Sequence, residues 1–334
     1  MENKKILITG GAGFIGSRLS EILVEQGDDV FVVDNLSTGS RQNIAGLENK
    51  ENFHFIEGSV LDEQLMKEII LGKDEIYHLA AAVGVKQILD KPLNSLLTNI
   101  KGAEIVLREA AENNVKVLIT STSEVCGKGD KMPFKEDDDR TYGSVYNDRW
   151  VYAFSKAVDE FLALAYWREK KLPVVVVRLF NVIGPRQTGA YGMVVPAFIK
   201  HALAGESMVI FGNQGHGHGE QTRCFADIDD IAPALIKLMA NEQAQGQVTN
   251  LGTDQEISIN NLAKEIQDAV EEITGQRPPE PQRISYEQAY PRGYEDFERR
   301  VPDLTKAKSL IGYQPKISLR ESIRKIIQFQ KAPN

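Results

Sequence analysis

Short apolar runs alternate with longer amphipathic segments through the first half of this chain, and this alternation constrains the fold more than any other feature. Continuous apolar runs, such as the four valines of residues 174–177, are typical of strands covered on both faces, because a solvated face would show polar residues at alternate positions. Each intervening helix must return the chain to the same end of the sheet, which requires right-handed crossovers. The sequence therefore predicts an α/β fold with a Rossmann-type, doubly wound parallel sheet.

The same periodicity assigns individual segments. The predicted strands are residues 6–9, 30–34, 53–57, 75–79, 116–120 and 173–179, and the predicted helices are residues 18–26, 62–70, 93–113, 152–170, 227–240 and 318–330. Beyond about residue 181, glycine and proline become frequent and the apolar runs shorten, which indicates a change of architecture. We expect residues 1–180, with 225–250 returning to them, to form the first domain. Residues 181–224 and 251–334 are expected to form a smaller C-terminal α/β substrate-binding domain.

The balance of charge limits the classes of partner. The 334 residues carry a formal net charge of −8 with a pI of about 5.4, and no basic stretch interrupts the acidic background. Such a surface repels phosphate backbones and anionic membranes, so we expect neither nucleic acid nor a membrane as a partner. The only cysteines are Cys126 and Cys224, and no apolar run approaches the ~20 residues that span a bilayer. These features predict a cytoplasmic protein.

Gly10, Gly13 and Gly16 directly follow the first predicted strand and open a helical segment. In this G-x-x-G-x-x-G arrangement, the first glycine permits a tight turn, the second lets a pyrophosphate approach the backbone, and the third lets the helix pack on the strand. The helix N-terminus adds unpaired N–H groups and the positive end of its dipole. The pattern predicts a dinucleotide-binding site.

Asp34 closes the second predicted strand, 24 residues after Gly10. A carboxylate at this position can accept hydrogen bonds from the hydroxyls of an adenosine ribose, and it would repel a 2′-phosphate. The sequence therefore favours NAD over NADP as the cofactor.

Tyr152 and Lys156 form Y-x-x-x-K within a predicted helix. Residues four apart lie on one helix face, so the phenol and the ammonium can reach the same substrate atom. The ammonium and the positive nicotinamide ring are expected to favour phenolate, which lowers the pKa of the phenol from about 10 toward the range of a general base. Thr122 ends a preceding strand and is available as a hydroxyl partner.

Six motifs occur in a fixed order along nearly the whole chain. They are Gly-Gly-Ala-Gly-Phe-Ile-Gly (10–16), His-Leu-Ala-Ala (78–81), Ser-Thr-Ser-Glu-Val (121–125), Tyr-Ala-Phe-Ser-Lys (152–156), Arg-Leu-Phe-Asn-Val-Ile-Gly-Pro-Arg (178–186) and Arg-Arg-Val-Pro-Asp (299–303). In these motifs the chain resembles the extended short-chain dehydrogenase/reductase family of nucleotide-sugar epimerases, dehydratases and decarboxylases. The resemblance implies bound NAD, a UDP-linked sugar as substrate, oxidation at C4 of the sugar, and a homodimer formed through residues 93–113 and 152–170.

The resemblance also implies roles for individual residues. The expected catalytic residues are Thr122, Glu124, Tyr152, Lys156 and Arg223. The expected NAD-binding residues are Gly10, Gly13, Phe14, Ile15, Gly16, Asp34, Asn35, Ser37, Thr38, Gly39, Ser59, Val60, Leu79, Ala80, Ala81, Asn99, Tyr152 and Lys156. The expected substrate-binding residues are Lys86, Ser123, Arg149, Asn181, Val195, Arg223 and Arg300.

The reaction that follows C4 oxidation is expected to depend on Glu124. Epimerases that the chain resembles usually carry a small neutral residue at this position, whereas decarboxylases and some dehydratases carry Glu. Arg149-Trp150 and the Gly-Tyr-Glu-Asp segment 293–296 are similar to segments of UDP-glucuronate-decarboxylating relatives, and Arg223 lies where those enzymes place an active-site arginine. These features favour decarboxylation of UDP-glucuronate, to UDP-xylose or a UDP-4-keto-pentose.

Other features keep alternatives open. Residues 82–86 lack the Pro and Tyr typical of decarboxylases and are more similar to an epimerase loop. Cys126 replaces a usual Tyr and is expected to leave a smaller, less polar wall in the sugar pocket. Residues 122–124, Thr-Ser-Glu, also occur in GDP-mannose dehydratases. The alternatives are a UDP-sugar 4-epimerase acting on UDP-glucose or UDP-glucuronate, a nucleotide-sugar 4,6-dehydratase, and a non-catalytic NAD or nucleotide-sugar sensor, which would need none of the catalytic side chains.

Two glycine- or proline-containing segments in the second half of the chain are expected to form loops. His216 and His218 alternate with glycines, but two histidines without a third ligand make a poor metal site, so we expect a glycine loop and no metal. Residues 277–302 are rich in Pro, Arg, Tyr and acidic residues, and we expect them to form binding loops.

Overall fold

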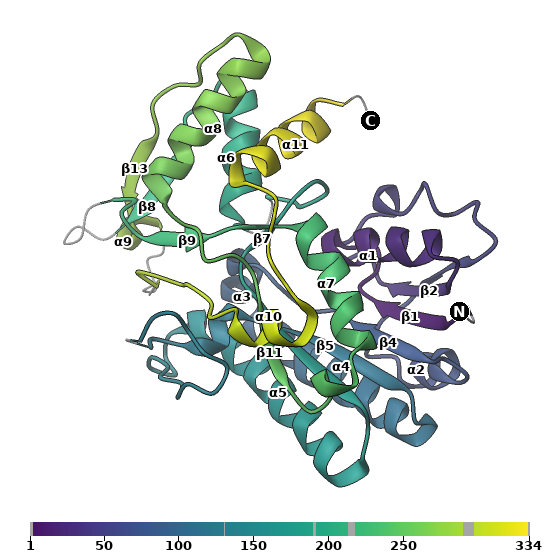
Figure 1. Ribbon diagram of the computed structural model, residues 1–334. Coiled ribbons are helices and arrows are strands. Elements are labelled where there is room, and N and C mark those ends of the chain that lie inside the picture. Colours follow the sequence, from purple (N-terminus) through teal and green to yellow (C-terminus); the bar gives the residue numbers. More distant parts are fainter. Residues whose placement is uncertain (1–2, 130, 190–191, 213–217, 290–296, 333–334) are drawn as a thin grey trace.

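The computed structural model describes residues 3–129, 131–189, 192–212, 218–289 and 297–332. A seven-stranded sheet runs through it in the order β11-β6-β5-β4-β1-β2-β3, and every neighbouring pair is parallel (Figure 1). Its strands are β1 (Lys5–Thr9), β2 (Asp29–Asp34), β3 (Phe53–Glu57), β4 (Glu75–His78), β5 (Lys116–Thr122), β6 (Val174–Leu179) and β11 (Val248–Leu251). The predicted parallel sheet is confirmed, and β11 adds a strand that the sequence pattern did not reveal.

The order of the strands reverses beside β1. From β1 the chain moves outward through β2 and β3, and it then returns to β4 on the other side of β1. The loops that leave the carboxyl ends of β1 and β4 therefore diverge, and the crevice between them is the usual ligand site in sheets of this kind. The glycine motif of residues 10–16 begins at this crevice.

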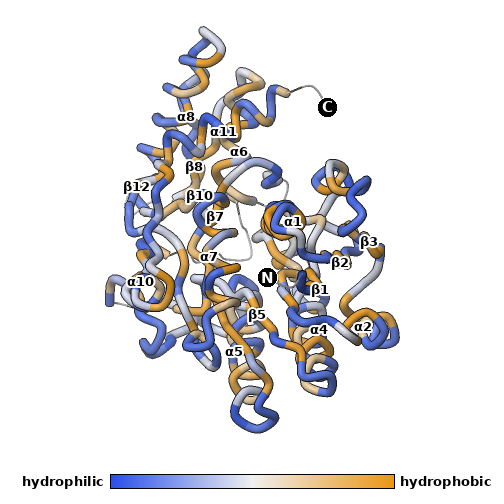
Figure 2. The backbone as a smooth tube through the Cα atoms, turned by 45° about the vertical axis from the view of Figure 1, so that its right-hand side comes forward, coloured by the Kyte–Doolittle hydropathy of each residue, from blue (hydrophilic) through white to orange (hydrophobic). Residues whose placement is uncertain are grey.

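Helices cover both faces of the sheet (Figure 1). One face packs against α1 (Phe14–Glu25), α7 (Ile228–Ala240) and α10 (Thr305–Ile311), and the other against α2 (Glu63–Ile70), α4 (Pro92–Asn113) and α5 (Val151–Lys170). In β1, Ile6 and Ile8 join the first core and Leu7 joins the second, as the two-residue period of a strand requires. Figure 2 shows hydrophobic residues concentrated in the strands and in the helices beside them. Within the described ranges, no helix combines the length and apolarity that crossing a membrane requires.

A second group of elements has its own hydrophobic core and lies above the sheet in Figure 1. Its helices are α6 (Val194–Leu203), α8 (Ile259–Thr274), α9 (Tyr286–Ala289) and α11 (Leu319–Lys331). Its short strands pair as β7 (Val182–Ile183) with β10 (Ala226–Asp227), β8 (Val209–Gly212) with β13 (Gln282–Ser285), and β9 (Thr222–Cys224) with β12 (Glu256–Ser258). The predicted domain boundaries stay a prediction. The helix α10, from the segment assigned to the second domain, packs against α7 and β11 and so also returns to the sheet.

Ion pairs connect α1 to the second group of elements. Arg18 on α1 donates to Asp229 near the start of α7 (2.8 Å), and Lys325 on α11 donates to the same carboxylate (2.9 Å). Arg186, in the loop after β7, pairs with Glu21 on α1. Each partly exposed pair contributes about 1 kcal/mol or less, but together they hold α11 and the loop after β7 close to the glycine motif.

Candidate active site

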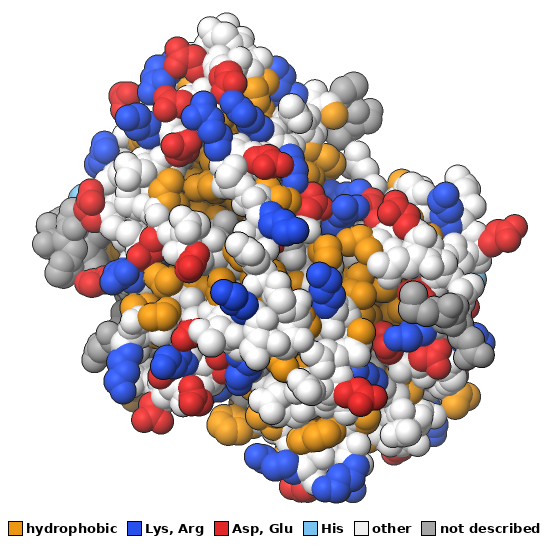
Figure 3. Space-filling model, viewed as in Figure 1, with side chains coloured by type: hydrophobic (Ala, Val, Ile, Leu, Met, Phe, Trp, Pro, Cys, Tyr) orange, Lys and Arg blue, Asp and Glu red, His pale blue; other side chains and the backbone are white. Residues whose placement is uncertain are grey.

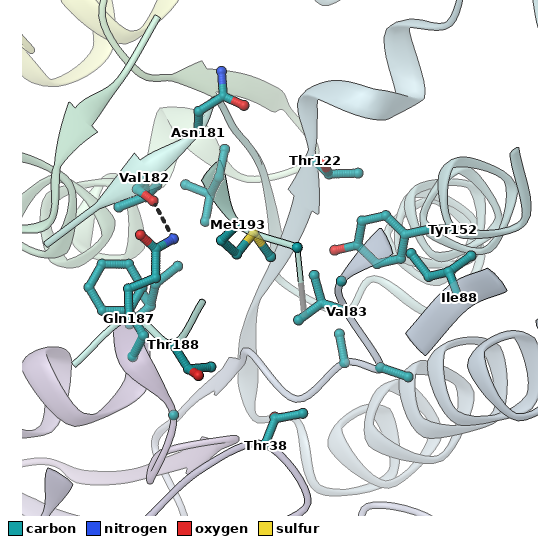
Figure 4. Close-up of a pocket in the computed structure, with 18 of the residues that line it drawn as sticks. Thr38, Val83, Ile88, Thr122, Tyr152, Asn181, Val182, Gln187, Thr188 and Met193 are labelled. Carbon is teal, nitrogen blue, oxygen red and sulfur yellow. Dashed lines mark hydrogen bonds between the residues drawn. The ribbon is translucent and has the colours of Figure 1, made fainter. Parts of the chain in front are cut away.

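A cavity of about 1070 Å³ occupies the crevice at the carboxyl ends of the strands. The glycine motif, the ends of β2 and β5 and the start of α5 form one side, and α6, β8 and α9 contribute to the other. Figure 4 shows the phenol oxygen of Tyr152 directed into this space beside Thr122, with Gln187 and Thr188 on the opposite side. The cavity exceeds the size that one drug-sized ligand fills, so it can hold two ligands next to each other.

The glycine motif is packed too closely for side chains. Gly10 has a φ of +72°, and a Cβ there would lie 2.8 Å from the nitrogen of Ala80 after β4. A Cβ on Gly16 would overlap the carbonyl oxygen of Gly10. Gly13 is the N-cap of α1 and has no side chain to cap the first N–H groups. A loop of this shape, with the uncapped start of a helix beside it, fits the diphosphate of NAD.

Asp34, at the end of β2, is held in place by the backbone around it. Its Oδ2 accepts a hydrogen bond from the N–H of Ala12 (3.0 Å), and its Oδ1 accepts one from the N–H of Leu36 (2.8 Å). Burial raises the pKa of Asp34, and these two hydrogen bonds oppose that shift. The carboxylate lines the cavity with lone pairs to spare, so it fits the hydroxyls of an adenosine ribose.

Nearly all the predicted NAD-binding residues line this cavity. They are Gly10, Gly13, Phe14, Ile15, Gly16, Asp34, Asn35, Ser37, Thr38, Ser59, Val60, Leu79, Ala80, Ala81, Tyr152 and Lys156. Gly39 and Asn99 are not part of its wall. A Cβ on Gly39 would lie 2.9 Å from Oδ2 of Asp34, so the lack of a side chain at this position leaves room for the carboxylate. Asn99 accepts from the N–H of Ala82 (2.8 Å) and donates to Ser155 (2.9 Å), which ties the loop after β4 to α5.

Thr122 and Tyr152 come from different elements that meet at the cavity. Thr122 is the last residue of β5, and its hydroxyl accepts the N–H of Glu124 (3.3 Å). Tyr152 lies in the first turn of α5 and is buried. Burial raises the pKa of the Tyr152 phenol, and the negative charges of Glu124 and Asp159 raise it further. This direction is opposite to the one expected from the Lys156 ammonium, because burial of the phenol and the two carboxylates outweigh its effect.

Lys156 is paired inside the protein. Its Nζ donates to Oδ2 of Asp159, one turn further along α5, at 2.7 Å. The exposed fraction of the two side chains is 3% and 0%. Burial raises the pKa of Asp159, and the ammonium opposes that rise. The two charges therefore form a buried pair, and both residues follow Tyr152 on the same helix.

Glu124 and Arg149 form a bidentate ion pair on the cavity wall. Nη2 of Arg149 donates to Oε1 of Glu124 at 3.0 Å, and Nη1 donates to Oε2. Nη1 of Arg300 lies 3.7 Å from the same Oε1. The ring of Phe297 packs against both guanidinium groups, with its centroid 5.4 Å from Cζ of Arg149 and 4.7 Å from Cζ of Arg300. Residues that are far apart in the sequence thus converge on one carboxylate.

The other predicted substrate-binding residues are placed as follows. Asn181 donates to the carbonyl of Cys224 (2.9 Å) and accepts from Arg300 (3.3 Å), and Arg223 donates to the carbonyl of Thr222 (2.7 Å). The wall of the cavity includes Ser123, Arg149, Asn181, Val195, Arg223 and Arg300. The backbone of Lys86 belongs to the short helix α3 (Val85–Asp90), but its side chain lies outside the described residues.

Cys126 and His78 lie close to the site and are held in the protein interior by packing and hydrogen bonding. Cys126 packs against Phe134 and Phe180 and is not part of the cavity wall, so the expected effect of this residue on the sugar pocket is not observed. His78 is buried at the end of β4, with Nδ1 2.8 Å from Oγ1 of Thr9. Burial, helped by the charge of Lys156, lowers the pKa of His78 to about 3.

The expected glycine loop and part of the expected binding loops cannot be compared with the structure. His216 and the segment 293–296 lie outside the described residues. In the part of the chain that is described, no three His, Cys, Asp or Glu side chains gather as metal ligands would.

Sequence reasoning missed several residues of the cavity wall. They are Gln187, Thr188, Met193, Phe198, Phe211, Gln221, Ile284 and Tyr286. Gln187 follows the motif of residues 178–186 directly and donates to the carbonyl of Val182 (2.9 Å), so its place next to a binding motif was a usable signal (Figure 4). Ile284 and Tyr286 belong to the segment 277–302, which was predicted to bind ligand without a choice of residue.

Comparison with known proteins decides the family. The chain matches the GDP-mannose 4,6 dehydratase family over residues 7–326. It belongs to this family of extended short-chain dehydrogenases/reductases. A UDP-N-acetyl-alpha-D-glucosaminuronate decarboxylase from Bacillus cytotoxicus is 38% identical over 98% of this chain and 97% of that one. UDP-glucuronic acid decarboxylase 1 from Danio rerio is 36% identical over 98% of this chain and 73% of that one.

A solved relative shows the same fold with cofactor and sugar present. The UDP-glucuronic acid 4-epimerase from Bacillus cereus, in complex with NAD and a UDP-linked fluorinated glucuronic acid, superimposes with a TM-score of 0.83. It is 27% identical and covers 98% of this chain and 99% of its own. The family member described here is accordingly an NAD-dependent enzyme that modifies nucleotide-sugars.

Proposed function

We propose that this enzyme decarboxylates a UDP-linked hexuronic acid, with UDP-glucuronate as the first substrate to test. The observation that carries the proposal is the Glu124–Arg149 pair in the cavity, next to Thr122 and Tyr152. Epimerisation needs only hydride and proton transfer at C4, whereas decarboxylation also needs charged groups at C5 and C6. Two decarboxylases among the relatives, 38% and 36% identical over nearly the whole chain, support the same reaction.

The first step is oxidation of the C4 hydroxyl. Tyr152 takes the hydroxyl proton, Thr122 shares a hydrogen bond with the same oxygen, and Lys156 holds a ribose hydroxyl of the cofactor. Bound NAD supplies the acceptor for the hydride that leaves C4. Asp34 and the glycine motif, which line the same cavity, orient the cofactor.

The second step is loss of CO2 from the 4-keto sugar. The electrons of the C5–C6 bond move into the C4–C5 enolate, because the carboxylate is β to the new ketone. Arg223 and Arg300 line the same cavity and supply positive charge for the carboxylate or the enolate oxygen. Glu124 lines the cavity beside Thr122 and is the carboxylate that relays a proton to C5 in this proposal. If a reduced cofactor held by Asp34 and the glycine motif returned its hydride to C4, the product would be the pentose; if it were released instead, the 4-keto-pentose would remain.

Two candidate substrates differ only in the substituent at C2 of the sugar. The relative with 38% identity acts on a 2-acetamido uronic acid, and the one with 36% identity acts on glucuronic acid. Both share the C6 carboxylate and the C4 hydroxyl, so the proposed chemistry is the same. We therefore propose UDP-N-acetylglucosaminuronate as the second substrate.

A panel of nucleotide-sugars tests the proposal. The purified enzyme with NAD is incubated with UDP-glucuronate, UDP-N-acetylglucosaminuronate, UDP-glucose or UDP-galactose, and products are read by mass spectrometry and NMR. We expect loss of CO2 from a uronate, and no loss of CO2 with the Tyr152→Phe variant. If no uronate releases CO2 while UDP-glucose and UDP-galactose interconvert, the enzyme is an epimerase. Loss of water would instead identify a 4,6-dehydratase, and binding without any turnover would identify a sensor.

We also propose that two copies pair through α4 and α5. Four large apolar side chains on these helices are exposed, namely Leu93, Leu97, Phe154 and Phe161. In Figure 3 hydrophobic side chains reach the surface in the lower part of the molecule, where Figure 1 places α5. An apolar patch of this kind is typical of an interface between copies. Light scattering should give the mass of a dimer for the native chain and of a monomer for Phe161→Asp, and a monomeric native chain would contradict the proposal.

The cellular location stays a prediction. Cys126 and Cys224 are both free and buried, which agrees with the compartment expected from the sequence.

A further inference from the structure

Asp159 continues the line of catalytic side chains on α5. Tyr152, Lys156 and Asp159 follow the i, i+4, i+7 spacing of one helix face. Nζ of Lys156 donates to Oδ2 of Asp159 at 2.7 Å, and the carboxylate has an exposed fraction of 0%. Its second oxygen, Oδ1, is buried and has no hydrogen-bond partner among the described residues.

Packing alone does not account for this carboxylate. A buried charge with one unsatisfied oxygen is unfavourable, and an apolar residue of similar size at position 159 would avoid that cost. Buried ion pairs also add little to stability compared with apolar residues in the same space. Among the described residues, the contact with Lys156 is the interaction of Asp159 that can compensate for this cost, so we expect the carboxylate to act on the ammonium.

We propose that Asp159 is a positioning residue for Lys156, and that its charge limits how strongly the ammonium promotes ionisation of Tyr152. Asp159 holds the ammonium in place and leaves two of its three N–H donors for a cofactor hydroxyl. Its negative charge offsets the charge of Lys156, so the phenol keeps its proton until further positive charge enters the cavity. The oxidised cofactor carries that charge, and proton removal from the sugar is thereby coupled to the presence of the correct cofactor state.

Other groups act on the same pair. The charged or titratable side chains described around Tyr152 and Lys156 are Glu124, Arg149, Asp159, Glu160 and His78. Glu124 is a second negative charge that acts on the phenol, but it is already paired with Arg149. His78 has its pKa lowered to about 3 by burial and by Lys156, so it carries no charge in the working range. Among these groups Asp159 is the carboxylate that contacts the ammonium directly.

Titration of Tyr152 without turnover tests the inference. Protein labelled at the tyrosine ζ carbon is saturated with oxidised NAD in the absence of any sugar, and the Tyr152 resonance is assigned by its loss in Tyr152→Phe. We expect its midpoint to fall by about one pH unit in Asp159→Asn, because the uncompensated ammonium then favours phenolate. Asp159→Glu, which keeps the charge, and Glu169→Gln, which removes an exposed charge from the same helix, should keep the native midpoint.

Equal midpoints in the native protein and in Asp159→Asn would overturn the inference. Asp159→Ser, which leaves space for a water molecule beside the ammonium, serves the same comparison if the asparagine variant does not fold. The inference rests on Tyr152 as the base in the proposed function, but the titration needs no substrate. A lowered midpoint in a protein that turns over none of the sugars would therefore support the inference and contradict the proposed function.

Discussion

Both terminal nitrogens of Arg149 donate to the two carboxylate oxygens of Glu124, so these side chains form a bidentate pair inside the cavity. Charge-assisted pairs of this geometry are stronger than single contacts, and they fix the orientation of both partners. Glu124 follows β5 and Arg149 precedes α5, so the pair also links the two elements that carry Thr122 and Tyr152. Its removal should affect chemistry and folding in separable ways.

Glu124→Gln should separate the two chemical steps. Because Tyr152, Thr122 and Lys156 are retained, C4 oxidation should continue and appear as NADH absorbance after addition of UDP-glucuronate. Formation of the product protonated at C5 should fall by about 100-fold or more, since a neutral amide cannot relay a proton to C5. Asp148→Asn, a carboxylate change in the same segment as Arg149, is the control and should keep the native rate. A native rate of product formation in Glu124→Gln would remove Glu124 from the mechanism.

A double-mutant cycle should measure the pair itself. Arg149→Met leaves Glu124 without its main partner and should lower the free energy of unfolding by about 3 kcal/mol, as seen by urea denaturation. Combining it with Glu124→Gln should restore part of this loss, giving a coupling energy of about 1–3 kcal/mol. Losses that simply add would mean that the contact does not contribute to folding.

His78 should make the protein less stable in acid. Its pKa is lowered from 6.5 to about 3 in the folded state, so the unfolded chain binds a proton on this ring first as pH falls. The stability that neutral His78 contributes is complete above pH ~6.5 and is lost toward pH ~3, at about 1.4 kcal/mol per pH unit. Urea unfolding at several pH values should show a smaller slope for His78→Gln than for the native protein. His201→Gln, at a more exposed histidine, is the control, and equal slopes for all three proteins would contradict this account.

Asp34 should determine the choice between NAD and NADP. Asp34→Ala should weaken NAD binding by about tenfold, because charge-assisted hydrogen bonds to the ribose hydroxyls are lost. NADP should bind more tightly to this variant than to the native protein, since the repulsion of its 2′-phosphate is removed. Calorimetry with both cofactors provides the comparison, and Asp29→Asn, at the other end of β2, is the control. If the preference for NAD survives in Asp34→Ala, another group selects the cofactor.

The sequence predicted the sheet well because continuous apolar runs have few other uses in a chain of this kind. All six predicted strands are observed with small changes at their ends, such as the extension of β5 to Thr122. The first helix begins at Phe14 and not at residue 18, because Gly13 is its N-cap and the end of the glycine motif is already helical. The strand β11 was missed because it has four residues, two of them polar and adjacent, and so shows neither a continuous apolar run nor an alternating pattern.

Site residues could be predicted where they belong to one short sequence motif. They could not be predicted where the fold brings distant segments into contact. Tyr152, Lys156 and the glycine motif are recognisable from spacing alone, and the i, i+3 relation of Lys156 to Asp159 was also visible there. The convergence of Arg149 and Arg300 on Glu124 could not be seen, because residue 300 reaches this point only through tertiary packing. The pKa of Tyr152 was predicted in the wrong direction because burial of the phenol, the largest cause of the rise, and the charge of Glu124 both arise from tertiary packing.

The position of β11 has a consequence for how the chain matures. This strand completes the edge of the sheet beside β6, yet it is synthesised after β7, β8 and β9, which belong to the other core. Domains begin to fold as they leave the ribosome, N-terminal parts first, but here the first sheet is complete only after residues 248–251 have been synthesised. A nascent chain that has emerged to that point contains the glycine motif, Asp34 and Glu124, and still lacks Arg300. The two ligands therefore gain their sites at different moments in the synthesis of one molecule.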